Sequence, residues 1–480
     1  MCKGTNFISE IGKYFKGNNA MNAMENITSM MENITFSEST LFGKRSKCNC
    51  KFSQLQTLQL LLMFPCFMVK NVFNYAGSSL YSIANCGKDV FYRFLACEDY
   101  DWRKILFSFS LQLWRKTQTH SERKNKNVPT CLLVDDTDYP KRGCHAEMIG
   151  KVFSHVEHKM VLGFKGLFLG ITDGASQMLL DFCLVGEKGK QGNYNLKQKQ
   201  LDSRFTKERD GESHTAKRKA EYDKSKIELT IEMVKRIIAK KIHFDYILAD
   251  SWFACAEIIK FVTSRHIKCH YLGMIKMGKT KYQYNGKDYT ARALVEVLNK
   301  SKMRKHSKRY GCFHITADVV FAGRKVRLFF TKRGKNAEWN GLITTNTSLG
   351  FLDAYRIYSM RWSLEVVFKD SKSNLGLGKY QMRNFTSQIA STAITAMQYN
   401  LLSAARRFSD YETIGGLFKD ATSQSIELTV TERIYDLLLE MVIAIAECFD
   451  LDDEQVLNAI INDSEKIERL FKIYQQKIAG

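Results

Sequence analysis

Five residues that could bind or cleave a phosphodiester fall on one strip of a predicted helix at residues 355–380. This segment has no proline, and no glycine before residue 376, so it favours a helix. On a wheel of about 100° per residue, one phenol, one carboxylate and three cations line up beside an apolar stripe. They are Tyr358, Arg361, Glu365, Lys369 and Lys372. A surface helix with ordinary i,i+4 ion pairs is the simplest alternative interpretation.

Two acidic segments upstream each follow a predicted buried strand. The apolar run at residues 131–134 is broken by Asp135, Asp136 and Asp138, and the run at residues 244–249 ends in Asp250. Carboxylates beside apolar strands are costly to bury unless a cation neutralises them. For the first group, a turn rich in Asx caps is the alternative. An acid at a strand end that leads into a helix occupies a common site position in α/β sheets.

The order and spacing of these residues resemble a known family. Tyr358-x2-Arg361-x3-Glu365-x6-Lys372 resembles the Y-R-E-K signature of DDE transposases of the insertion-sequence-four family. Four specified residues at fixed offsets arise by chance in roughly one window per hundred thousand at average amino-acid usage. The resemblance implies an α/β, ribonuclease-H-like mixed sheet with an inserted, mainly-β subdomain, flanked by helical regions at both ends of the chain.

The resemblance also implies a triad of acids, which we assign to Asp136, Asp250 and Glu365. Asp136 is preferred because it directly precedes Thr137, as in the D-D-T-like motif of the family, and Asp135 is the second choice. Two divalent ions about 4 Å apart can activate an oxygen nucleophile and stabilise the leaving oxygen. Carboxylates suit hard ions best, so we expect two Mg²⁺, or Mn²⁺ in their place, at these acids.

The remaining candidate residues would bind DNA. By resemblance, Tyr358, Arg361 and Lys372 grip phosphates near the scissile end, and Lys369 lies on the same strip. Relatives that cleave through a DNA hairpin stack a flipped base on a tryptophan of the insertion. Trp339 is the only tryptophan in this insertion and is our candidate, with core packing as the alternative.

Composition favours a nucleic-acid partner. The 480 residues carry a formal net charge of +22, which points to nucleic acid or an anionic membrane. No apolar run is long enough to span a membrane, and we expect a cytoplasmic, nucleoid-associated bacterial protein with reduced cysteines. Residues 276–309 hold 11 bases and 2 acids, whereas residues 431–480 hold 11 acids and 5 bases. DNA therefore suits the insertion and not the C-terminal region.

Strand, turn and helix signals divide the chain into five parts. Residues 173–174 and 285–286 read as hairpin turns between strands. The parts are a poorly ordered leader (1–50), an N-terminal helical DNA-binding region (51–125), a catalytic core (126–276 and 346–410), an inserted β subdomain (277–345) and a C-terminal helical dimerisation or regulatory region (411–480).

The leading hypothesis is a transposase that cuts double-stranded DNA at terminal inverted repeats and joins it to target DNA by cut-and-paste, as a homodimer. A divalent-metal nuclease without strand joining, or a catalytically silent DNA-binding derivative, are alternatives of the same fold. A tyrosine recombinase would need two arginines and a histidine around a late tyrosine, and the sequence shows no such set.

Overall fold

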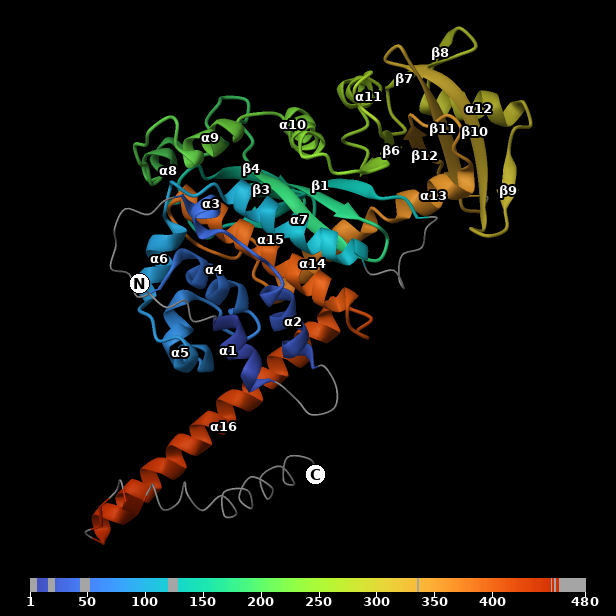
Figure 1. Cartoon of the computed structure of the whole chain (residues 1–480). Helices are drawn as coiled ribbons and strands as arrows, with labels where there is room; N and C mark the ends of the chain where they lie inside the picture. Colours follow the sequence, from blue (N-terminus) through green and yellow to red (C-terminus); the bar gives the residue numbers. More distant parts are fainter. Residues whose placement is uncertain are drawn as a thin grey trace.

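The computed structural model describes residues 7–15, 22–43, 52–119, 128–334, 336–449, 451–452 and 455–456. A twelve-stranded mixed sheet runs through the molecule, and helices cover both faces of one half of it (Figure 1). Within those ranges, no helix is long and apolar enough to cross a membrane.

The strand that carries the first acids lies in the middle of the helix-covered half. β1 (Cys131–Pro140) pairs antiparallel with β3 (Lys159–Thr172) and parallel with β5 (Tyr246–Ala249). Three further strands complete this half: β2 (Gly150–Ser154) and β4 (Gln177–Val185), both antiparallel to β3, and β6 (His270–Ile275), parallel to β5. Antiparallel strands followed by two parallel ones form the ribonuclease-H-like arrangement, so the predicted fold class is confirmed.

The turn between β3 and β4 is the predicted hairpin. Asp173 Oδ1 accepts hydrogen bonds from the backbone N–H groups of Ala175 (3.0 Å) and Ser176 (2.8 Å). Gly174 has φ +85°, a left-handed conformation that glycine adopts without steric cost. The side-chain hydrogen bonds of Asp173 and the left-handed backbone of Gly174 therefore stabilise the predicted turn.

The other half of the sheet is the insertion (Figure 1). Its elements are β7 (Lys281–Tyr284), β8 (Lys287–Thr290), α12 (Ala291–Lys300), β9 (Lys305–Ser307), β10 (Cys312–Phe321), β11 (Arg324–Lys332) and β12 (Asn340–Thr344). Asn285 and Gly286 have φ 49° and 78°, which confirms the predicted type I′ turn. β12 pairs with β6 from Gly341 opposite Ile275, so the insertion extends the core sheet. The sequence pattern did not predict α12, although Thr290 caps its N-terminus.

Two layers of helices cover the first half of the sheet (Figure 1). One layer holds α8 (Gln198–Asp202), α9 (His214–Glu221), α10 (Lys226–Ala239) and α11 (Ala256–Val262). The other is built on α7 (Trp102–Thr119) and α15 (Phe385–Arg407), which both pack on β4. Almost every residue of α15 is buried, because helices from both ends of the chain also pack against it.

The predicted leader at residues 1–50 contains packed helices in its described part. Three of them precede the predicted N-terminal region: α1 (Phe7–Tyr14), α2 (Ala23–Glu32) and α3 (Glu38–Phe42). α2 packs on α15 because one of its faces is apolar, with Met24, Ile27 and Met31 buried. The chain then continues through α4 (Gln54–Met63), the 3₁₀ helix η1 (Val72–Gly77), α5 (Ser79–Ile83), α6 (Lys88–Leu95) and α7.

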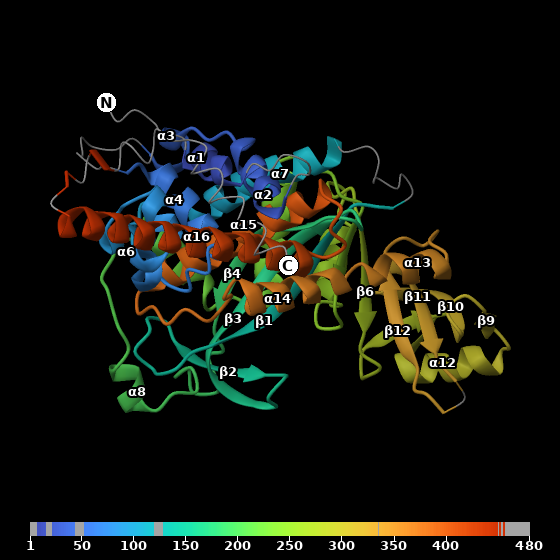
Figure 2. The ribbon, with the colours of Figure 1, turned by 90° about the horizontal axis from the view of Figure 1, so that it is seen from below.

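The predicted helix at residues 355–380 is two helices, α13 (Phe351–Ser359) and α14 (Trp362–Asn374). At their junction the backbone N–H of Arg361 bonds to the carbonyl of Tyr358, three residues back, at 3.0 Å. This tighter turn ends α13. The helix α16 (Ile414–Cys448) runs across the N-terminal helices in Figure 2, and its C-terminal half projects beyond them in Figure 1.

Candidate active site

The acids of β1 lie just after the point where its parallel pairing with β5 ends. β3 pairs with all ten residues of β1, whereas the parallel pairing with β5 stops at Val134 opposite Ala249. Asp135 and Asp136 are therefore strand residues, and the predicted break after residue 134 is wrong because β3 continues alongside. Since successive side chains of a strand point to opposite faces, the two carboxylates project to different sides of the sheet.

Asp135 points toward α14 and meets the predicted helical strip. Arg361 Nη1 lies 2.9 Å from Asp135 Oδ2, and Arg361 Nη2 lies 2.6 Å from Glu365 Oε1. One guanidinium thus holds two carboxylates that are 230 residues apart in the chain. All three side chains are mostly buried, with Glu365 the most exposed at 35%. These charge-assisted contacts are stronger than those between neutral groups.

Asp136 lies on the opposite face and contacts a different helix. Its Oδ2 forms an ion pair with Lys226 Nζ at the first residue of α10. Asp138 pairs with Lys165 on the neighbouring strand. The structure therefore does not bring Asp136, our first choice from the sequence, together with Glu365. It brings Asp135 there, because the alternation of the strand assigns each acid to one face.

Asp250 follows the last residue of β5 and lies beside Asp135. Its Oδ1 accepts a hydrogen bond of 2.9 Å from the backbone N–H of Trp252, which fixes the turn after the strand. The charge of Asp250 acts on Asp135: burial raises the pKa of Asp135 to about 7, Arg361 opposes this rise, and the neighbouring Asp250 adds to it. The site therefore concentrates negative charge beyond what one arginine neutralises.

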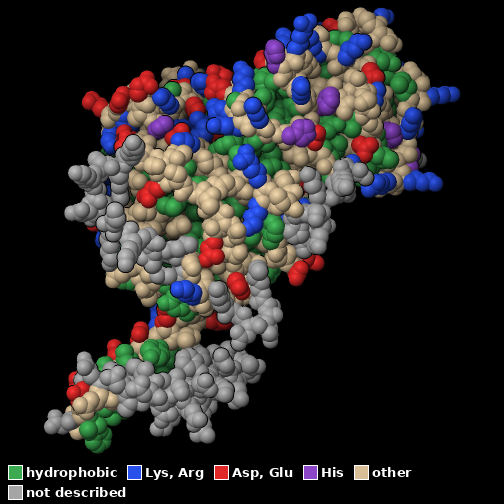
Figure 3. All heavy atoms as spheres, viewed as in Figure 1, with side chains coloured by type: hydrophobic (Ala, Val, Ile, Leu, Met, Phe, Trp, Pro, Cys, Tyr) green, Lys and Arg blue, Asp and Glu red, His purple; other side chains and the backbone are tan. Residues whose placement is uncertain are grey.

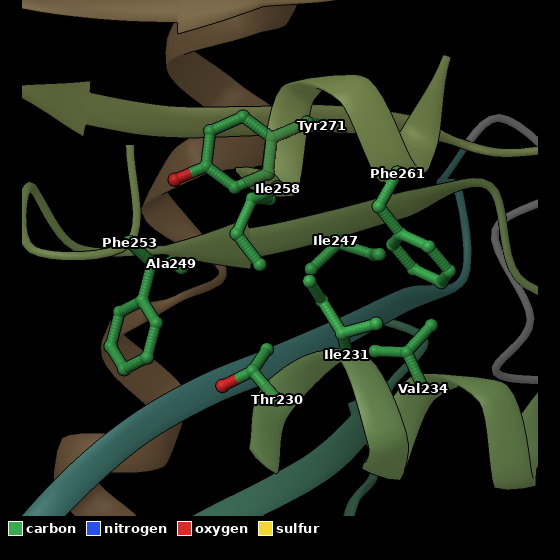
Figure 4. Close-up of a pocket in the computed structure, with 9 residues that line it drawn as sticks. All are labelled: Thr230, Ile231, Val234, Ile247, Ala249, Phe253, Ile258, Phe261 and Tyr271. Carbon is green, nitrogen blue, oxygen red and sulfur yellow. The ribbon is translucent and has the colours of Figure 1, made fainter. Parts of the chain in front are cut away.

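Apolar packing fixes the strand end that carries Asp250. Side chains from α10, β5, the turn after β5, α11 and β6 converge around a small pocket in Figure 4, namely Thr230, Ile231, Val234, Ile247, Ala249, Phe253, Ile258, Phe261 and Tyr271. Most are fully buried, and close packing of this kind resists displacement. This packing therefore holds the turn at Asp250 in a fixed position.

The other predicted residues of the strip are near this acid pair or farther along α14. Arg361 Cζ lies 5.8 Å from the ring centre of Tyr358. Lys372 is partly buried, which lowers its pKa, and Lys369 is exposed. Trp339 directly precedes β12 and packs partly buried against the core. Its predicted stacking role therefore stays a prediction.

The donor atoms of the site suit a hard divalent cation. Carboxylate oxygens come from three elements. The hydroxyl oxygen of Tyr271 is buried without a hydrogen-bond partner among the described residues, and that of Tyr358 is buried beside Arg361. Asp250 contributes to a raised pKa at both phenols, after the larger effect of burial, which places them near its charge. Across the described ranges, however, no three acidic, histidine or cysteine side chains lie close enough to hold a metal ion. Arg361 takes the position between Asp135 and Glu365 instead.

The raised pKa of Asp135 predicts a pH-dependent stability. A carboxyl with a folded pKa near 7 and an ordinary pKa near 4 destabilises the fold when ionised, so its cost grows from about pH 4 to about pH 7 and is constant above. At about 1.4 kcal/mol per unit, the cost reaches about 4 kcal/mol at most. We expect Asp135→Asn to be more stable than the unmodified chain at pH 8 by up to this amount, and to lose that advantage toward pH 4. Urea denaturation at several pH values measures the difference. A variant less stable than the unmodified chain at pH 8 would contradict the assignment.

Residues 70–277 match the family model described as DDE superfamily endonuclease. This stretch is similar to DDE superfamily endonucleases. It includes Asp135, Asp136 and Asp250 and ends before Glu365. The match supports a DDE-type endonuclease or transposase, without support for the insertion-sequence-four family or its Y-R-E-K signature. A search of curated proteins finds no match.

Two solved structures show weak similarity to this chain. The cryo-EM structure of a piggyBac transposase synaptic complex with hairpin DNA is 12% identical, with TM-score 0.43, and the alignment covers 90% of this chain and 83% of that chain. The NurA nuclease from Sulfolobus solfataricus is 8% identical, with TM-score 0.25, over 57% of this chain and 85% of that one. Likenesses this weak carry no argument about function.

Three residues around the acids of β1 and β5 were not predicted. Lys226 and Tyr271 come from α10 and β6, and neither has a sequence signal that connects it to the acids. Trp252 does have one, since it lies two residues after Asp250. The alternation of side chains along a strand separates Asp135 from Asp136, but it does not tell which of them faces α14.

Proposed function

We propose that this chain is a DDE transposase that cuts DNA at the ends of an insertion element and joins the freed 3′ ends to target DNA. The observation that carries the proposal is the pairing of Asp135 and Glu365 on Arg361, with the charge of Asp250 beside them. Asp135 and Glu365 share one arginine, and Asp250 follows the strand β5, which pairs with β1 up to Val134, in a strongly basic protein. The family-model match to DDE superfamily endonucleases supports the same reaction class.

In this proposal Asp135, Asp250 and Glu365 would hold two divalent ions, Mg²⁺ or Mn²⁺. Bound there, the ions would supply Lewis-acid stabilisation of the attacking and leaving oxygens. The chain contributes a water-poor setting, because Asp135 and Arg361 are largely buried. It also contributes cations for the DNA backbone: Arg361 as a bidentate donor, and Lys372 and Lys369 farther along α14. The buried hydroxyl of Tyr358, beside Arg361, is a further candidate phosphate donor.

The basic insertion supports a role in binding double-stranded DNA along its backbone. All eleven lysines and arginines between residues 276 and 309 are exposed. In Figure 3, Lys and Arg side chains gather on the part of the surface formed by the insertion. Contacts of this kind to phosphates give affinity without sequence preference. The N-terminal helical region would then supply recognition of the terminal repeats.

A second copy of the chain would bind through α16. The projecting part of this helix keeps large apolar side chains exposed, including Leu437, Leu438, Met441 and Ile445. Their spacing follows a helical face, and an apolar stripe of this kind is the usual seam between paired helices. A dimer would place two acid sites on the two ends of one element.

A joining assay tests the function. DNA fragments that flank the reading frame, incubated with the protein, Mg²⁺ and a supercoiled plasmid, are expected to yield plasmid covalently joined to fragment ends. Cut fragments without joined products would favour the alternative, a DDE-type endonuclease, which the description of the matching family equally fits. Absence of both products, with DNA still bound, would favour a catalytically silent derivative.

A further inference from the structure

Arg361 occupies the space between two acids of the candidate active site. Both of its terminal nitrogens are engaged, Nη1 with Asp135 at 2.9 Å and Nη2 with Glu365 at 2.6 Å. The Arg361 side chain is only 15% exposed, so water and salt screen these contacts weakly. Within the described ranges, no three side chains of the kinds that ligate metals lie close enough to hold an ion. In this arrangement a residue of the chain supplies the positive charge that an ion would otherwise supply.

The guanidinium and a divalent ion are competitors for this position. Two cations a few ångströms apart in a partly buried site repel strongly, because their surroundings screen them far less than bulk water does. The oxygens of Asp135 and Glu365 that accept hydrogen bonds from Arg361 are also those that an ion between the two acids would need. Ion binding therefore requires the Arg361 side chain to leave the acids.

Arg361 is placed so that its side chain is free to leave without moving a helix. It lies at the turn between α13 and α14, and it is the N-cap of α14 without a side-chain hydrogen bond to that helix end. A phosphate accepts the same bidentate contact from a guanidinium as a carboxylate does. Lys369, exposed farther along α14, would attract a DNA strand to this helix. Phosphates of that strand would then compete with the acids for Arg361.

We propose that Arg361 keeps the acid site closed to divalent ions until DNA binds, and that a DNA phosphate opens the site by taking over the guanidinium. The free protein holds an internal cation, and the DNA complex exchanges it for Mg²⁺ or Mn²⁺. Such an exchange couples the two ligands, so DNA and ions raise each other's affinity by the same factor. The proposal rests on the proposed function, since it describes how DNA and ions reach the same site. It confines metal-dependent chemistry to bound DNA.

Metal binding by the protein without DNA tests this proposal independently of cleavage. Mn²⁺ is the probe, and electron paramagnetic resonance measures its free concentration during a titration. We expect Arg361→Gln, which removes the charge, to bind Mn²⁺ about 5- to 150-fold more tightly than the unmodified chain. Arg361→Lys keeps a positive charge and is expected to bind Mn²⁺ as weakly as the unmodified chain. The matched control is Arg356→Gln on α13, expected to leave the Mn²⁺ affinity unchanged, because Arg356 is 35% exposed and pairs with Asp353 at 3.3 Å.

Equal or weaker Mn²⁺ binding by Arg361→Gln, with its fold intact by circular dichroism, would overturn the proposal, as would an equal gain in Arg356→Gln. If Arg361→Gln does not fold, a crystal of the unmodified chain with DNA and without metal ions decides. Arg361 is expected there on a DNA phosphate, and its retention between Asp135 and Glu365 would overturn the proposal. Failure of the proposed function would look different: neither cut nor joined DNA in Mg²⁺, with the tighter Mn²⁺ binding by Arg361→Gln intact.

Discussion

Replacing Asp135 with Asn is expected to lower metal-dependent DNA cleavage by at least about 10³-fold, whereas Asp136→Asn is expected to retain activity within about tenfold. A metal ligand at the reacting phosphate contributes several kcal/mol of transition-state stabilisation, and each 1.4 kcal/mol is a factor of ten in rate. Only Asp135 shares Arg361 with Glu365. Asp136 is held by Lys226 on the other face of the sheet.

The comparison between these two variants is well matched. The residues are adjacent, belong to one strand, and each forms an ion pair with similar side-chain exposure, 18% for both acids. Asp250→Asn and Glu365→Gln are expected to behave as Asp135→Asn does. Cleavage rates for labelled end fragments in Mg²⁺, with DNA binding measured in parallel, provide the readout. An inactive Asp136→Asn beside an active Asp135→Asn would return the assignment to the choice made from the sequence.

Asp135→Asn is therefore expected to have two effects, one on cleavage and one on the pH dependence of stability. The variant should be inactive and also more stable than the unmodified chain at pH 8, because the buried charge destabilises the fold. A residue whose charge destabilises the fold but supports activity has a functional rather than a structural role. A purely structural acid would lose stability when neutralised.

Replacing Asp181 with Asn is expected to lower the free energy of unfolding by about 3–5 kcal/mol, the cost of leaving buried charges without their partner. Asp181 lies on β4 with 4% of its side chain exposed. Arg103 Nε and Arg236 Nη2 each approach it at 2.8 Å, and Arg218 Nη1 lies at 3.9 Å. Burial alone would raise the pKa of Asp181, but these three arginines hold it below the ordinary value.

This cluster matters for the site because it joins three helices to one strand. The arginines belong to α7, α9 and α10, and α10 begins at Lys226, which contacts both Asp136 and the ring of Trp252. Loss of Asp181 would leave these guanidinium groups with Glu221 as the remaining carboxylate that contacts Arg103 and Arg218. We therefore expect Asp181→Asn to lower the free energy of unfolding. We also expect it to displace α10, and with it Lys226 beside Asp136.

An exposed ion pair on the insertion is the control for this prediction. Asp318 pairs with Arg327 at 2.6 Å, but 58% of the Asp318 side chain is exposed. Exposed pairs contribute about 0–1 kcal/mol, so Asp318→Asn is expected to shift the urea midpoint only slightly. Similar losses in the two variants, or a loss below about 1 kcal/mol for Asp181→Asn, would show that the buried cluster does not hold the helices in place.

Local signals in the sequence predicted the parts of the site that local structure determines. The apolar run before Asp250, the Asp173-Gly174 turn, the Asn285-Gly286 turn and the strip on residues 358–372 all depend on residues close together in the chain. Each is present in the structure, apart from the turn that divides the predicted helix after Ser359. Of the four residues of the spacing pattern, Tyr358 lies in α13 and Glu365 and Lys372 lie in α14, and Arg361 lies at the turn between the two helices.

Contacts between distant segments could not be predicted in the same way. The choice between Asp135 and Asp136 depends on which face of β1 receives α14, and that is set by pairing with β3 more than twenty residues later. The pairing of β12 with β6 joins the insertion to the core across a longer gap, since Gly341 lies opposite Ile275. The cluster around Asp181 gathers arginines whose spacing in the sequence has no regular pattern.

Anomalous diffraction from crystals of the protein grown with Mn²⁺ and an end fragment of DNA tests most directly whether three distant acids share one metal site. We predict a peak contacted by Asp135, Asp250 and Glu365, with Arg361 turned from the acids toward a DNA phosphate. A peak at Asp136, or Mn²⁺ bound elsewhere while Arg361 still bridges Asp135 and Glu365, would contradict the assignment of the active site.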